Sequence, residues 1–137
     1  MKSLFLLAML FFIIISCSKD YETISIDSDI IVSAEKVGDA VVLNAETEKY
    51  YATLGHKITF NKKVKNNEIY VKFREVKVPN VGLTTLGPAL CSINLDALKN
   101  GKYPIIFDHD NIETKGKLTV GASLELSIEP GSNVRAH

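Results

Sequence analysis

Tryptophan is absent from this sequence of 137 residues, and cysteine and methionine occur only twice each. The absence of tryptophan disfavours a sugar-binding platform built from exposed aromatic rings. The formal net charge is zero, so the chain lacks the single-sign field that attracts nucleic acid or a strongly charged substrate. It also lacks a Gly-Xaa-Ser-Xaa-Gly elbow and a glycine-rich phosphate loop. We therefore expect no enzymatic activity, no cofactor and no nucleic-acid partner.

The first residues have the three parts of a secretory signal peptide. Lys2 supplies positive charge, an uninterrupted apolar run extends from Leu4 to Ile15, and the small residue Ser16 follows it. The apolar run has about 12 residues, whereas a membrane-spanning helix needs roughly 20. These features predict that residues 1–16 are a signal peptide, which is removed from the mature protein.

The end of this leader, Ile14-Ile15-Ser16-Cys17, resembles the lipobox of bacterial lipoproteins. The resemblance implies that Cys17 receives a diacylglyceryl thioether, that the chain is cut before it, and that a fatty acid such as palmitate is added to the new amine. Two or more acyl chains anchor a protein stably in a bilayer, so membrane lipid is the first expected partner. The alternative is an ordinary signal peptide with an accidental cysteine.

The residues after the cysteine bear on location. Lys19-Asp20-Tyr21-Glu22 resembles the lysine-plus-acid export signal of Bacteroidetes surface lipoproteins, although Tyr21 separates the two acids. This resemblance implies a lipid anchor in the outer membrane of the cell envelope, with display at the surface. The alternative is a solvated polar tether without an export role. We predict that residues 17–29 are the lipidated N-terminus and tether, and that residues 30–137 form the folded domain.

In residues 30–137, short apolar stretches alternate with polar residues, and no segment indicates a helix. The clearest alternation covers residues 123–129 and is typical of a half-buried antiparallel strand. The same pattern at residues 91–95 predicts that Cys91 is a small buried hydrophobe. Because Cys17 is expected to be acylated, Cys91 has no partner for an intramolecular disulfide.

Two hairpins are predicted around asparagine-containing turns. Lys65-Asn66-Asn67 favours a tight turn because asparagine tolerates the left-handed backbone. His109-Asp110-Asn111 predicts a longer and looser connection. In the second strand of the first hairpin the buried parity changes, which predicts a bulge near Arg74-Glu75. The strands expected to flank the turns cover residues 58–64 and 68–78, and residues 103–108 and 115–120.

Seven or eight antiparallel strands at this spacing favour a β-sandwich over a barrel. The segment Leu95-x-x-Leu98-x-x-Gly101-x-Tyr103 resembles the connection before the penultimate strand of immunoglobulin-like and fibronectin-III-like domains. The resemblance implies an all-β, immunoglobulin-like sandwich. It also implies a tyrosine corner, in which the hydroxyl of Tyr103 caps backbone upstream. The alternative is that Tyr103 is an ordinary strand residue.

The most suggestive polar cluster for chemistry is Asp108-His109-Asp110. Carboxylates can converge on calcium and histidine can bind zinc, so these three residues are candidate metal ligands. The alternative is a polar turn, because Asp and Asn are the commonest turn formers. His56 lies far from this cluster in sequence, and no spacing of ligand residues nominates a complete zinc site.

Three function classes remain open at this stage. The first is a membrane-anchored, non-catalytic module that binds an envelope protein or polymer. The second is an envelope inhibitor or immunity-type protein directed against a hydrolase. The third is a small metal-dependent enzyme, for which the sequence offers only the weak ligand candidates. Fold-level analogy alone does not choose among such classes.

Overall fold

The computed structural model describes residues 21–137, and these residues form ten β-strands and no helix. The proposed signal peptide, the lipobox with Cys17, and Lys19 and Asp20 lie outside the described residues. The strands are β1 (Thr23–Ile24), β2 (Ile30–Val37), β3 (Ala40–Tyr51), β4 (Lys57–Lys65), β5 (Glu68–Lys77), β6 (Gly87–Asn94), β7 (Gly101–His109), β8 (Ile112–Val120), β9 (Leu124–Ile128) and β10 (Val134–Ala136).

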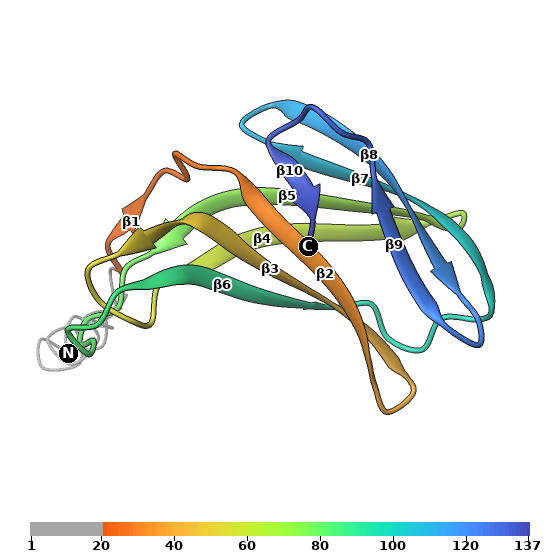
Figure 1. Cartoon of the computed structure of the whole chain (residues 1–137), viewed down its shortest axis with the longest axis horizontal. Coiled ribbons are helices and arrows are strands. Elements are labelled where there is room, and N and C mark those ends of the chain that lie inside the picture. Colours follow the sequence, from red (N-terminus) through yellow and green to blue (C-terminus); the bar gives the residue numbers. More distant parts are fainter. Residues whose placement is uncertain (1–20) are drawn as a thin grey trace, which may run out of the picture.

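The strands are joined in one hydrogen-bonded path with the order β10-β2-β3-β6-β4-β5-β7-β8-β9, and β1 pairs with β5. At the ends of this path β9 contacts β2 and β10, so the sheet is nearly closed (Figure 1). The predicted all-β class is confirmed, whereas the predicted sandwich is not. The predicted number of seven or eight strands is too low, because β1 and β10 have two and three residues and show no readable alternation.

The sequence had led us to expect only antiparallel strand pairs, but some pairs are parallel. β5 pairs with β7 in parallel, starting at Ile69↔Ile105, and β10 pairs with β2 in parallel. β4 and β6 share a single parallel pair, Lys57↔Leu90. Parallel neighbouring strands need a long crossover connection. Between β5 and β7 this connection includes β6, which pairs with β3. Short-range alternation does not reveal such a crossover.

The core lies inside the curved sheet and is built from alternate residues of the long strands. The largest fully buried side chain is Phe107 of β7, which stacks at 6.1 Å between ring centroids on Phe73 of β5. In β5, Ile69 and Val71 are buried with Phe73, Arg74 and Glu75 are exposed, and burial resumes at Val76.

This change of parity in β5 confirms the predicted bulge. The register passes from Phe60↔Phe73 to Ile58↔Val76, so Arg74 and Glu75 both oppose Thr59. The hydroxyl of Thr59 donates to the carbonyl oxygen of Glu75 at 3.1 Å and accepts from its N–H at 3.3 Å. A side chain of the partner strand therefore supplies bonds that the bulge removes from the ladder.

Both predicted hairpins form, and both have two-residue turns. Asn66 and Asn67 have φ of 52° and 63°, and Lys65 pairs with Glu68. Asp110 and Asn111 have φ of 54° and 59°, and the neighbouring pair is His109↔Ile112. Positive φ at both central residues is the type I′ geometry, whose twist matches that of the strands. The prediction of a longer and looser second connection was wrong, because Asp tolerates this backbone as Asn does.

The predicted tyrosine corner is present at the start of β7. The Tyr103 hydroxyl donates a hydrogen bond to the carbonyl oxygen of Lys99 at 2.8 Å, and only 8% of the residue is exposed. The buried ring and its single polar atom thus fix the loop that enters β7.

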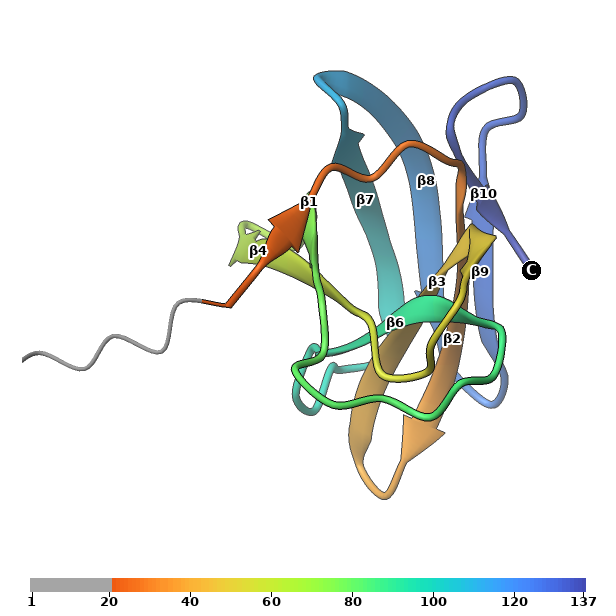
Figure 2. The same cartoon turned by 90° about the vertical axis from the view of Figure 1, so that its left-hand side faces the viewer.

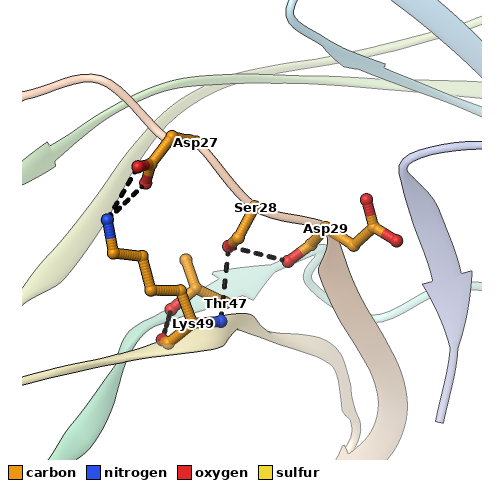
Figure 3. A network of polar contacts seen from close by, with 5 residues as sticks. All are labelled: Asp27, Ser28, Asp29, Thr47 and Lys49. Carbon is orange, nitrogen blue, oxygen red and sulfur yellow. Dashed lines mark hydrogen bonds and ion pairs between the residues drawn. The ribbon is translucent and has the colours of Figure 1, made fainter.

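Residues 21–29, expected to belong to the tether, contact the body. Thr23 pairs with Lys77 and Ile26 is buried. Figure 3 shows how the next residues meet a bulge in β3: Lys49 forms an ion pair with Asp27 at 2.7 Å, and the Lys49 N–H donates to the Ser28 hydroxyl at 3.4 Å. The path of the chain before β2 is therefore fixed on the body from Thr23 onward.

Candidate binding site

Asp108, the first of the candidate metal ligands, is engaged by side chains of β5. Its Oδ2 accepts hydrogen bonds from Lys72 Nζ at 2.7 Å and from the Tyr70 hydroxyl at 2.8 Å, and its side chain is 8% exposed. The Lys72 ammonium, opposed by burial and assisted by Tyr70, holds the pKa of Asp108 below its usual value. The hydrogen bond from the Tyr70 hydroxyl to Asp108 raises the pKa of Tyr70. This arrangement keeps Asp108 ionised and paired at neutral pH.

The other two candidate ligands lie apart from Asp108. Adjacent residues of a strand point to opposite faces, and the His109 Nε2 is directed to the carbonyl oxygen of Ser28 at 2.9 Å. Asp110 occupies the first central position of the β7–β8 turn. In residues 21–137 no three side chains of His, Cys, Asp or Glu are grouped so that they could hold a metal ion. The fold does not bring the three candidates to one point.

His56 is buried in a second structural contact, which the sequence did not reveal. Its ring stacks on Tyr51 with a centroid distance of 4.5 Å, and its Nδ1 lies 2.9 Å from the carbonyl oxygen of Thr53. His56 and His109 are thus each held by a backbone carbonyl group, and His56 also by its stacking on Tyr51.

Cys91 shares the inward parity of Ile93 and Leu95, as predicted, but it is half-buried while those two are fully buried. Burial raises the pKa of its thiol to about 12. A thiol with this pKa is protonated at neutral pH and is a poor nucleophile. Cys91 also borders a shallow hollow of about 350 Å³ on the outside of β2, β3 and β6.

A hollow of about 550 Å³ lies against the β4–β5 hairpin. Cross-strand register places Lys63 opposite Tyr70 and Lys65 opposite Glu68, so one face carries two ammonium groups beside a phenol and a single carboxylate. Tyr70 in turn contacts the buried Asp108. We call this surface the hairpin hollow; it is lined by Lys63, Lys65, Asn66, Glu68 and Tyr70.

The hairpin hollow is polar and open, and it holds a positively charged pair on a hairpin that projects beyond the core. From Asn61 to Lys65 both faces of β4 are exposed. Their positions in the sequence place these lysines in the predicted hairpin but do not show which residues share their face. The strand register, which the tight turn at Asn66-Asn67 fixes, supplies this information. It places Tyr70 and Glu68 on the same face as the two lysines.

Comparisons with protein-family models, with curated proteins and with solved structures find no significant match for this chain. Residues 21–137 contain no helix with the length and apolar character needed to cross a membrane.

Proposed function

We propose that the mature chain is a lipid-anchored, non-catalytic binding protein of the bacterial cell envelope. The proposed location in the cell envelope rests on the sequence, in which the apolar run from Leu4 to Ile15 is followed directly by Ser16-Cys17. Acylation of Cys17 would attach two or more acyl chains, which hold a protein on a bilayer far more stably than one. The resemblance of residues 19–22 to an export signal supports the outer membrane, with the body displayed at the surface.

One observation carries the non-catalytic part of the proposal: the buried side chains of Asp108, His56 and His109 are used as structural partners. Asp108 is paired with Lys72 and Tyr70, and His56 and His109 each face a backbone carbonyl. A side chain that acts as a general base or nucleophile must reach the substrate and have a pKa near the working pH. This pattern favours binding over catalysis.

The hairpin hollow is the surface that we propose for the partner, an envelope protein or polymer. Lys63 and Lys65 place two ammonium groups at its rim, and Glu68 supplies one compensating carboxylate. A partner that presents an anionic group would gain charge-assisted hydrogen bonds there. Tyr70 adds an amphipathic ring, a residue type that is enriched in interfaces.

The finer architecture belongs to the proposal as well. The tyrosine corner at Tyr103 and the single residue pair between β4 and β6 support a division of the strand path into two packed groups, as in an immunoglobulin-like sandwich. The parallel pairing of β5 and β7 departs from that pattern.

The anchor is tested by replacing Cys17 with alanine in the full chain. We expect complete loss of fatty-acid labelling and retention of the leader, because the thiol is the acylation site. Cys91→Ala is the matched control and should leave labelling unchanged. Normal labelling of the Cys17→Ala variant would reject the anchor.

The binding surface is tested by cross-linking in intact cells followed by mass spectrometry of the purified, lipidated chain. Lys63→Glu/Lys65→Glu is expected to reduce recovery of a stable partner by about tenfold or more, an effect equivalent to about 1.4 kcal/mol. Lys99→Glu/Lys102→Glu makes the same charge change on exposed lysines that do not line this hollow and should not change recovery. Equal recovery from both variants would exclude the hairpin hollow. Inhibition of a recovered hydrolase by the purified chain would instead identify an inhibitor.

A further inference from the structure

The loop between β5 and β6 exposes large apolar side chains to solvent. The exposed fractions are 93% for Val81, 72% for Leu83 and 68% for Leu86, and Leu54 of the β3–β4 loop beside them is 37% exposed. Scattered single apolar residues are normal on a protein surface, whereas a contiguous group marks an interaction site. We call residues 80–86 the apolar loop.

The apolar loop is supported by the neighbouring β3–β4 loop. The Leu54 N–H donates to the carbonyl oxygen of Leu83 at 3.0 Å, and the Thr85 N–H donates to the same oxygen at 2.7 Å. A Cβ added at Gly82 would lie 2.7 Å from the backbone oxygen of Leu54, so this position requires glycine for the two loops to meet. The apolar side chains therefore extend into solvent from a loop whose backbone is held in place by the β3–β4 loop.

The described chain begins at the base of the same loop. Tyr21, Gly55 and Asn80 line one hollow, and the Val78 N–H donates to the carbonyl oxygen of Glu22 at 2.9 Å. Figure 2 looks onto this end of the molecule, where the β3–β4 and β5–β6 loops lie together and the described chain begins just before β1. The β4–β5 hairpin lies at the opposite end of the long axis (Figure 1).

Chain length then limits how far this end can be from a membrane anchor. Tyr21 is the fourth residue after Cys17, and four fully extended residues span at most about 14 Å. An acylated Cys17 would hold the base of the apolar loop within that distance of its lipid. Lys57 and Lys77 line the hollow next to Asn80, so positive charge flanks the apolar side chains where anionic headgroups would lie.

We infer that the apolar loop inserts Val81, Leu83 and Leu86 into the interfacial region of the bilayer that anchors Cys17. Apolar side chains gain free energy at the boundary between headgroups and acyl chains, and nearby lysines are attracted to anionic lipid. The body then stands with its β3–β4 and β5–β6 loops on the membrane and presents the hairpin hollow away from it. This inference rests on the proposed lipid anchor.

The test uses the full, lipidated chain in vesicles of phosphatidylethanolamine and phosphatidylglycerol. An environment-sensitive fluorophore is attached to Leu83→Cys in a Cys91→Ala background and is exposed to lipids that carry a quencher at the acyl-chain boundary. Val64→Cys is the matched control, because Val64 is an exposed apolar residue next to the hairpin turn. We expect strong quenching at position 83 and none at position 64. The further changes Val81→Asp and Leu86→Asp should reduce quenching at position 83 by about tenfold.

Lipid labelling of Cys17 in the same samples separates the two possible failures. Labelled protein without quenching at position 83 overturns the insertion of the loop and leaves the anchor intact. Absence of labelling overturns the anchor and, with it, this inference. Cross-links between position 83 of two chains, in place of quenching, would assign the loop to a contact between copies.

Discussion

The two ends of the body differ in chemistry. At the end where the chain begins, a long loop holds Val81, Leu83 and Leu86 in solvent. At the opposite end, a two-residue turn at Asn66-Asn67 closes a hairpin whose exposed residues include Lys62, Lys63 and Lys65. The first end exposes apolar side chains that would gain free energy from burial against a partner. The second end exposes mainly polar and charged side chains, which are well solvated by water.

This difference shows how the same sheet supports two kinds of surface. The hairpin is built by local rules, since its turn residues and register follow from neighbouring residues. The apolar loop is held in place by contacts between β3–β4 and β5–β6 residues that are far apart in sequence, such as the bond from Leu54 to Leu83. Changes at each end should therefore affect stability for different reasons.

The largest effect is expected at Thr47, near the end with the apolar loop. Its hydroxyl donates to the carbonyl oxygen of Lys49 at 2.8 Å and accepts from the N–H of Ala89 at 2.9 Å, and the residue is 1% exposed. Thr47→Val keeps the shape and leaves two backbone groups without partners. At roughly 1–3 kcal/mol for each buried group, the free energy of unfolding should fall by about 3 kcal/mol.

Denaturant unfolding of the full chain measures this loss. Thr84→Val is the control, because Thr84 is an exposed residue in the apolar loop and the change should leave stability unchanged within about 0.5 kcal/mol. Equal stability of the two variants would mean that the bulge in β3 does not depend on Thr47.

A smaller effect is expected at the start of β7. Tyr103→Phe removes the hydroxyl that donates to the Lys99 carbonyl and should destabilise the fold by about 1–2 kcal/mol. Tyr50→Phe makes the same chemical change on a side chain that is 63% exposed and should be nearly neutral. An unchanged melting temperature for Tyr103→Phe would show that the corner contributes nothing to stability.

Much of the fold could be predicted from the sequence because it depends on local patterns. The bulge at Arg74-Glu75 follows from a change of parity within one strand, and the positions of the two turns follow from residues that tolerate positive φ, although the short second turn was not predicted. The tyrosine corner at Tyr103 was implied by the resemblance of residues 95–103 to immunoglobulin-like domains, and the structure identifies the Lys99 carbonyl as its acceptor. Near closure of the sheet and the parallel pairing of β5 and β7 could not be predicted in this way, because they depend on which distant strands become neighbours.

The candidate site was harder to predict for the same reason. Asp108 was identified as a polar residue of interest, but its partners Lys72 and Tyr70 are on another strand. The exposure of Val81 and Leu83 is a property of the folded surface, since their apolar character alone would favour burial. Residue type nominated Asp108 as a candidate metal ligand, whereas its tertiary contacts are an ion pair with Lys72 and a hydrogen bond from Tyr70.

The ion pair at the hairpin end gives a pH-dependent prediction. The folded pKa of Asp108 lies below its ordinary value of 3.8, so its contribution to stability is complete above that value and is lost as the pH falls through the folded pKa. Asp108→Asn should cost about 1 kcal/mol at about pH 7. The difference from the native chain should shrink as the pH falls below 3.8 and through the folded pKa of Asp108.

Urea unfolding of both chains across this pH range tests the linkage, since the remaining carboxyl groups titrate in both and cancel in the difference. Asp110→Asn makes the same chemical change at a neighbouring exposed turn position and serves as the matched control. A constant difference between Asp108→Asn and the native chain at every pH would mean that Asp108 acts only through shape and neutral hydrogen bonding.

The smallest effect is expected in the turn that closes the hairpin. Asn67 has φ of 63°, and glycine adopts this conformation without a steric cost, whereas any other residue with a Cβ pays part of the penalty for the left-handed region. Asn67→Gly should therefore raise the free energy of unfolding by about 0.5 kcal/mol or less, because the greater freedom of glycine in the unfolded chain offsets part of the gain. Asn67→Ala should lower it by about 1 kcal/mol. The opposite order of the two variants, measured by chemical denaturation, would show that the Asn67 side chain stabilises the turn by more than its tolerance of positive φ.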